Sequence, residues 1–287
     1  MPFSITLYQL LLYIPIVLCI KLPKQKVVPR LKSTIQNTID LNKKLQLSKS
    51  LAWFGEISGC AFIEDELIEM FDEELKQGYP EGYIENYDFI RGRKKNVLEG
   101  LYWRINQNIG LLAMSGDRVS KRTILHILEN TTSGGDVINW TGDRADYFNS
   151  RIDLKIIPFY NRILNLCFYA QRNSDEKFNK GLEKLLKDEN IGGFITEEYH
   201  LTRWRVYSGN LELHIGATLA RCGSKKGYEI LLGYFYDIHY NFKNFALNEL
   251  KEITSTDYGY DKKAWKEYIF TLSFPQDTKA LKKEIEW

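Results

Sequence analysis

The sequence has few of the residues that metal and redox sites need. Its 287 residues include 4 Cys and 4 His, and they form no CxxC, HxH or HExxH spacing. Zinc sites and thioredoxin-like sites depend on such spacings, so nothing in the sequence supports either class. Cys60, Cys167 and Cys222 each fall near the end of an apolar helical stretch or its turn, and we expect buried structural thiols there. His126 and His214 lie within amphipathic stretches, and we expect them to have packing or helix-capping roles.

A glycine-rich phosphate loop and a large net charge are also missing. No GxGxxG occurs, and 39 Lys and Arg face 37 Asp and Glu, a formal charge of +2. A dinucleotide pyrophosphate needs that loop at a helix N-terminus. Duplex nucleic acid draws most of its binding free energy from neutralised phosphates. We therefore expect no cofactor and do not favour nucleic acid as a partner.

Carboxylates are present in runs but not in an arrangement typical of acid and base catalysis. They fall on what the helical pattern predicts to be the exposed side of one helix, and we expect solvated faces there. The residues are Glu64, Asp65, Glu66, Glu69, Asp72, Glu73 and Glu74.

A short turn that recurs between apolar stretches is the most informative feature present. It occurs at Ile57-Ser-Gly-Cys60, Met114-Ser-Gly-Asp117 and Arg221-Cys-Gly-Ser224, with a weaker copy at Gln171-Arg-Asn-Ser-Asp175 that has Asn in place of Gly. Apolar residues recur at three- and four-residue steps on both sides of each turn, as in Leu98, Leu101 and Ile105. This pattern predicts helical hairpins that must stack to cover their apolar faces.

A fifth hairpin is expected at the end of the chain. Phe245, Ala246 and Leu250 start its stripe, and Asp261 is placed to cap a last helix that carries Trp265. The sequence thus predicts an all-α fold, an α-solenoid of about five helical hairpins over residues 31–287.

The first 30 residues differ from the rest. Residues 3–20 are almost uniformly apolar and are followed by Lys21, Lys24, Lys26 and Arg30. A membrane anchor or atypical signal, buried structure within the fold, and a start codon inside a longer reading frame all stay open. An anchor or signal would make the protein membrane-attached or extracytoplasmic, and otherwise it would be cytoplasmic. Pro23 and Pro29 predict an extended linker before the helices.

The hairpins resemble HEAT repeats, and the ending from Leu250 to Trp265 is similar to the terminal repeat of many bacterial HEAT-repeat proteins. The run from Leu45 to Tyr268 also resembles the helical carboxy-terminal region attached to some bacterial FAD-dependent oxidoreductases. Because this chain has no GxGxxG, that second resemblance implies the non-catalytic part of such a protein.

The distance between turns, about 50 to 57 residues, exceeds the roughly 40 to 47 of HEAT units. The excess lies in three connectors, residues 77–93, 131–151 and 190–207, which a solenoid would bring out on one edge. All three are rich in aromatic residues and Arg, which interfaces favour, although the same residues also anchor loops. The candidate binding residues of this insertion edge are Tyr83, Arg91, Arg93, Trp140, Arg144, Arg151, Trp204 and Arg205.

Two functions fit these patterns. The favoured one is a non-catalytic interaction or accessory module that docks a protein or neighbouring domain through the insertion edge, with membrane attachment through residues 3–20 still open. The alternative is an enzyme built on the solenoid, such as a HEAT-like DNA glycosylase, for which Asp146 and the Trp and Arg residues would supply the residue types. The near-neutral charge of this chain argues against a DNA glycosylase, because duplex binding depends on neutralising phosphates.

Overall fold

The computed structural model describes residues 24–77, 97–132, 153–188, 191–193, 203–278 and 280–281. For residues 77, 97–100, 102–103, 153–158 and 203–207 it describes the backbone alone. All regular elements within these ranges are helical, with 11 α-helices and 3 short 3-10 helices and no strand. The all-α prediction is confirmed.

The helices follow one another as hairpins. α3 spans Lys24–Asn37 and precedes five pairs. These pairs are α4 (Leu41–Trp53) with α5 (Cys60–Gln77), α6 (Val97–Ser115) with α7 (Lys121–Asn130), α8 (Asp153–Asn173) with α9 (Asn179–Leu185), α10 (Arg203–Arg221) with α11 (Lys225–Gly233), and α12 (Tyr240–Thr254) with α13 (Lys262–Thr271). The 3-10 helices η1 (Ile57–Gly59), η3 (Glu176–Phe178) and η4 (Tyr234–Tyr236) adjoin α5, α9 and α11.

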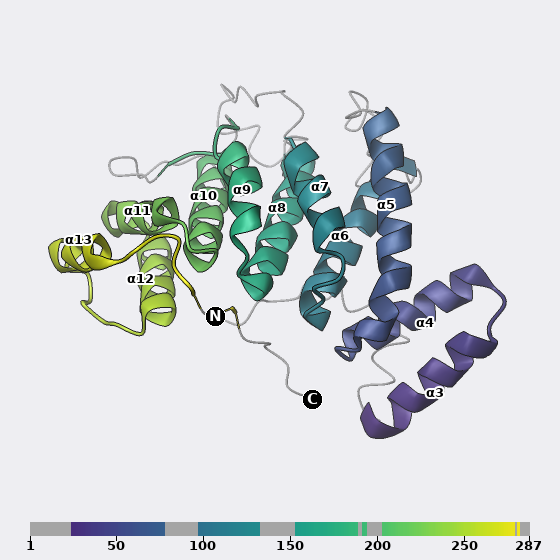
Figure 1. The fold of residues 1–287 in the computed structure, drawn as a ribbon. Helices are drawn as coiled ribbons and strands as arrows, with labels where there is room; N and C mark the ends of the chain where they lie inside the picture. Colours follow the sequence, from purple (N-terminus) through teal and green to yellow (C-terminus); the bar gives the residue numbers. More distant parts are fainter. Residues whose placement is uncertain are drawn as a thin grey trace.

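The pairs stack in two layers (Figure 1). In one layer α4, α6, α8, α10 and α12 each contact the next, and in the other α5 contacts α7, α7 contacts α9, and α11 contacts α13. One cluster of buried apolar side chains extends from Ala52 to Cys222, and a second joins α10 and α11 to α12 and α13. Each hairpin therefore buries its apolar face against its neighbours, as the recurring stripes predict.

Left-handed residues end the first helix of each pair. They are Gly55, Gly116, Ser174, Gly223 and Ser255, with φ of 74°, 70°, 48°, 80° and 57°. Gly116, Ser174 and Gly223 lie within the turns that the sequence indicates, whereas Gly55 lies two residues before Ile57-Ser-Gly-Cys60. Gly59 is needed for space instead, because a Cβ there would lie 2.4 Å from the backbone oxygen of Ser48.

The extended linker expected before residue 31 is wrong from Lys24 onward, because α3 begins there and runs through Pro29. Pro29 is the sixth residue of the helix and exposed, so its ring faces solvent and one backbone bond is lost. Val27, Val28 and Ile35 pack with Leu51 and Phe54. Burial of this apolar face outweighs the tendency of proline to interrupt a helix.

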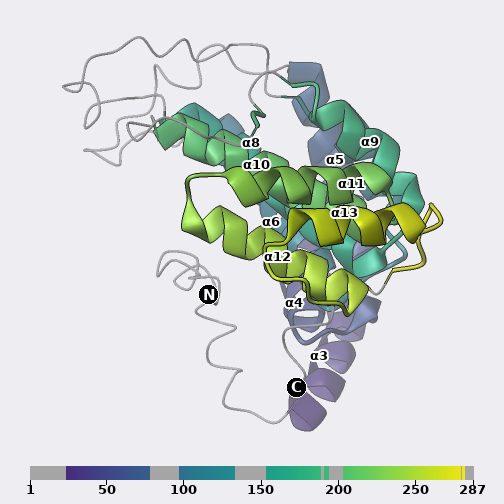
Figure 2. The same cartoon turned by 90° about the vertical axis from the view of Figure 1, so that its left-hand side faces the viewer.

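After α13 the chain turns back over the earlier hairpins as a carboxy-terminal tail, residues 272–278 and 280–281 (Figure 2). The Gln276 amide donates to the Gly223 carbonyl at 3.1 Å, and the Leu281 amide donates to the Gln171 carbonyl at 2.9 Å. Phe274 packs edge-on against Tyr228, with 5.6 Å between ring centroids. The tail thus joins two hairpins through the residues at their turns.

None of the helices within the described ranges is long and apolar enough to cross a membrane. Residues 3–20 lie outside those ranges.

Candidate functional site

The insertion edge falls outside what the structure describes. Tyr83, Arg91, Arg93, Trp140, Arg144 and Arg151, together with Asp146, are not among the described residues. Trp204 and Arg205 belong to the first turn of α10, but only their backbone is described. The insertion edge therefore stays a prediction.

A buried group between α5, α6 and α8 contains residue types that nucleophilic sites use. Cys60 Sγ lies 3.2 Å from Ser115 Oγ, and Asp117 accepts a hydrogen bond from the Tyr169 hydroxyl at 3.2 Å. Burial raises the pKa of the Cys60 thiol to about 11, and a thiol must ionise to act as a nucleophile. The group therefore packs the core, and the burial expected for Cys60, Cys167 and Cys222 is confirmed.

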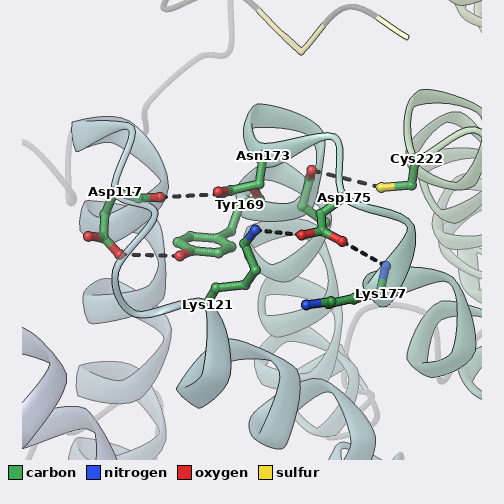
Figure 3. A network of polar contacts seen from close by, with 8 residues as sticks. Asp117, Lys121, Tyr169, Asn173, Asp175, Lys177 and Cys222 are labelled. Atoms are coloured by element: carbon green, nitrogen blue, oxygen red, sulfur yellow. Dashed lines mark hydrogen bonds and ion pairs between the residues drawn. The ribbon is translucent and has the colours of Figure 1, made fainter. Parts of the chain in front are cut away.

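Asp117 is the centre of a polar network that joins successive turns (Figure 3). Its carboxylate is fully buried and accepts from the backbone amides of Val119 and Ser120 at 3.1 and 2.9 Å. Its carbonyl accepts from the Asn173 side chain at 3.2 Å. Because these bonds satisfy the buried carboxylate and also end the turn before α7, the network holds α6 against α8.

The next turn continues the network. Lys121 Nζ lies 2.5 Å from Asp175, which also accepts from the Lys177 amide at 2.9 Å. Burial alone raises the pKa of Asp175, but the bonds from Lys121 and Lys177 outweigh it, so the pKa is lowered. Asp175 caps η3, the 3-10 helix directly before α9, through this bond from the Lys177 amide.

The solvated faces predicted for the carboxylates of α5 are wrong for three residues. Glu66 is held by Lys49 at 2.9 Å, by Asn108 at 2.9 Å and by Arg104. Glu64 accepts from the Thr123 hydroxyl at 2.6 Å. Glu74 forms a bidentate pair with Arg162, at 2.5 and 2.9 Å. These three carboxylates bond α5 to four neighbouring helices and are structural.

A shallow polar hollow lies where α7 ends beside α9. Glu129, Asn130, Lys180 and Lys184 are among the residues that line it. Lys180 Nζ lies 3.9 Å from Glu129 Oε1, and Lys184 donates to the Glu129 carbonyl. Nothing in this hollow selects a ligand.

Exposed aromatic side chains gather at the far end of the stack, near the start of α12 and α13. Tyr236 and Tyr240 are 57% and 68% exposed, and Tyr260 is 45% exposed. The terminal tyrosine patch is defined by these three rings together with Asn244 and Lys262.

Contacts join residues of the patch across η4, α12, α13 and the loop before α13. Lys262 Nζ lies 3.7 Å from the centroid of the Tyr236 ring. The Tyr260 hydroxyl donates to Asn244 Oδ1 at 2.7 Å. Tyr240 and Asn244 are four residues apart on α12 and so share one face of that helix.

Buried neighbours fix the base of the patch. Phe235, 8% exposed, meets the edge of Tyr260 with 5.5 Å between centroids. Tyr258 stands at 90° to the fully buried Trp265 at 5.2 Å, and the Trp265 indole donates to the Gly259 carbonyl at 2.9 Å. These contacts order the loop between α12 and α13, so Tyr260 is held in place before any partner binds.

The sequence indicated this patch only in outline. The Tyr content and the Tyr-Gly-Tyr loop before α13 are visible in the sequence. Which tyrosines remain exposed depends on contacts between η4, α12 and α13, and these do not follow from helical periodicity.

Within the described part of the chain, no cluster of His, Cys, Asp and Glu could hold a metal ion. No family model matches the chain, and the comparisons with curated proteins and with solved structures also found no match.

Proposed function

We propose that this chain is a non-catalytic interaction module, a HEAT-like α-solenoid of five hairpins that docks a protein partner through the terminal tyrosine patch. The observation that supports this proposal best is the combination of exposure and order at the patch. Three tyrosine rings are exposed, yet two of them are held, by Lys262 and by Asn244.

Tyrosine suits such a surface. Its ring offers a large contact area while only two torsions need to be fixed on binding, and its hydroxyl can still bond across the interface. Interfaces concentrate their binding energy in a few such residues, which are surrounded by contacts that exclude water.

Charge beside the patch favours an acidic partner surface. Lys262, Lys263 and Lys266 lie on α13, and burial together with the neighbouring Lys266 lowers the pKa of Lys262. A carboxylate on the partner would relieve this repulsion between cations.

Two cysteines and one arginine with potentially reactive side chains are engaged in the core. Burial raises the pKa of the Cys167 and Cys222 thiols to about 12. Arg221 is 1% exposed and paired with Glu249 at 2.8 Å and Glu252 at 3.0 Å. These groups hold the fold, which agrees with a module that presents a surface.

The insertion edge is the second surface that we propose for the same role. A flavin-dependent oxidoreductase, which the resemblance implies as a fused or neighbouring body, is the first partner to test.

The test begins with a photo-crosslinking residue at position 240 in cells that produce the chain, with the same residue at position 187 as the control. The partner captured only from position 240 is purified, and its affinity is measured for the wild type and for Tyr236→Ala/Tyr240→Ala. We expect a loss of about 2 kcal/mol or more, with an unchanged melting temperature because both rings are exposed.

A matched control is Leu75→Ala/Val119→Ala, which removes two exposed apolar side chains elsewhere, 45% and 69% exposed. This control should bind normally. Equal affinity of the wild type and the tyrosine variant would refute the role of the patch.

A further inference from the structure

The hairpin formed by α3 and α4 differs in charge from the rest of the chain. Between Lys24 and Phe54 there are 7 cationic residues and one acid, Asp40, a formal charge of +6. The rest of the chain then has 32 Lys and Arg against 36 Asp and Glu. The cations are Lys24, Lys26, Arg30, Lys32, Lys43, Lys44 and Lys49.

Part of this charge is neutralised internally and part is not. Lys24 and Lys32 lie 3.7 and 2.8 Å from the Glu56 carboxylate, and Lys49 pairs with Glu66. The three other exposed cations, Lys26, Arg30 and Lys43, form no ion pair with any residue that the structure describes.

The unpaired cations of α3 lie together on its outer side. Lys26 and Arg30 are one turn apart and exposed, whereas Val27, Val28 and Ile35 are buried against α4. The helix therefore presents a basic face on the side that does not pack.

Large aliphatic side chains are exposed at the tip of the hairpin. Ile39 is 97% exposed and Leu41 is 76% exposed. They flank Asp40, whose side chain caps α4 by accepting from the Lys43 amide at 3.1 Å. In Figure 1 this tip, at the lower right, is directed away from the other helices.

We propose that the α3–α4 hairpin binds an anionic membrane surface. Lys26, Arg30 and Lys43 would contact lipid headgroups, and Ile39 and Leu41 would enter the interface at the tip. Basic residues beside exposed aliphatic residues are the composition of interfacial membrane-binding elements, and anionic leaflets attract such segments over about a Debye length.

Two observations favour a bilayer over nucleic acid, which also binds cations. Nucleic acid offers no environment for Ile39 and Leu41, whereas the lipid interface does. The apolar run at residues 3–20 also ends shortly before α3 in the sequence, so any insertion of that run would bring the start of α3 to the membrane.

The test measures co-sedimentation of the full chain with vesicles of phosphatidylcholine alone and of phosphatidylcholine mixed with phosphatidylserine. We expect stronger binding to the anionic vesicles. Lys26→Gln/Arg30→Gln/Lys43→Gln should reduce that binding by roughly 10- to 100-fold and abolish its dependence on salt. Ile39→Ser/Leu41→Ser should reduce binding to the anionic vesicles severalfold.

Controls with the same chemical change elsewhere should bind like the wild type. For charge the control is Lys187→Gln/Lys225→Gln/Lys226→Gln, three exposed lysines. For apolar surface it is Val119→Ser/Phe270→Ser, 69% and 86% exposed.

Three outcomes would overturn the proposal. The first is the absence of binding, or binding that is equal for the two vesicle compositions. Equal binding would leave residues 3–20 as the sole attachment. The second is hairpin variants that bind anionic vesicles like the wild type. The third is hairpin variants that lose binding to nucleic acid while their vesicle binding is unchanged, which would assign the surface to that other partner.

Discussion

At the scale of single residues, this protein uses buried charge mainly to join helices. Arg162 is 1% exposed, and its planar guanidinium reaches both oxygens of Glu74 and the Asn106 side chain. Lysine could not make this bidentate pair. Such a pair adds little net stability, because desolvation offsets its attraction, but loss of one partner is severe. Buried pairs of this kind favour one register between hairpins.

His214 gives the fold a pH dependence that can be measured. Its ring packs against Phe245 with 4.6 Å between centroids, and burial lowers its pKa from 6.5 to about 4. The unfolded chain therefore binds a proton at a higher pH than the folded chain does. The contribution of His214 to stability is present above pH 6.5 and is lost as pH falls toward about 4.

We expect His214→Gln to remove about 1 kcal/mol of the fall in unfolding free energy over the upper part of that window, down to about pH 5, a value discounted for partial exposure. Urea unfolding between about pH 7 and about pH 5 measures this fall. His126→Gln, at an exposed position, is the control and should keep the wild-type slope. An unchanged slope in His214→Gln would show that the ring is hydrated in the fold.

At the scale of elements, the residue that ends each first helix determines how the hairpin closes. Glycine occupies three of the five left-handed positions and serine the other two. A side chain is strained in this conformation, and glycine is not. The two turns that serine closes are therefore less stable than the same turns would be with glycine.

A substitution to glycine and a substitution from glycine at these turns should change stability in opposite directions. We expect Ser255→Gly to raise the free energy of unfolding by about 0.5 to 1 kcal/mol, and Gly116→Ala to lower it by about 1 to 2 kcal/mol. Gly223→Ala should be worse, because its Cβ would also lie 2.4 Å from the Gln276 carbonyl oxygen. Chemical denaturation checks all three.

Gly110→Ala is the control for loss of a glycine without a left-handed backbone. The residue lies within α6, and the atoms nearest to an added Cβ would be those of the Asn165 side chain, at 3.4 Å or more. Its change should stay below about 1 kcal/mol. If Gly110→Ala destabilised the chain as much as Gly116→Ala, backbone strain at the turns would not be the reason.

Helical periodicity predicts where the helices lie, but it does not predict which of their polar side chains are enclosed by neighbouring helices. The stripe through Leu98, Leu101 and Ile105 indicates a helix correctly, because one buried face is enough to define the period. It does not show that α5 is enclosed on several sides, which is why Glu64, Glu66 and Glu74 were assigned to solvent. Pro29 was assigned to a linker because local preference was weighed without the burial of Val27 and Val28.

At the scale of the whole molecule, the stack is not held by neighbour contacts alone. The tail bonds to Gly223 on one hairpin and to Gln171 on the hairpin before it. Nothing in the sequence predicts this contact, because the tail has no apolar period and its bonds use backbone groups. The exposed ends of the stack, where the terminal tyrosine patch and the α3–α4 hairpin lie, are likewise visible in the sequence only as composition.

Ending the chain after Thr271 should weaken the carboxy-terminal half selectively. Tyr228, 1% exposed, would lose the ring of Phe274, and the Gly223 and Gln171 carbonyls would lose their donors. We expect a loss of about 2 to 4 kcal/mol and faster amide hydrogen exchange in α10 and α11, with little change in α4 and α5. A chain that ends at Leu281 keeps these bonds and is the control. Uniform loss of protection along the chain would mean that all hairpins unfold as one unit.

The bond between the tail and Gln171 can form only after the end of the tail has been synthesised. The Gln171 carbonyl and its donor, the Leu281 amide, are 110 residues apart, the difference of their numbers. At translation rates of roughly 5 to 20 residues per second, the donor is synthesised about 5 to 20 s after the acceptor. The hairpin of α8 and α9 therefore spends that interval on the ribosome without its last contact, and a nascent-chain chaperone would meet it in this incomplete form.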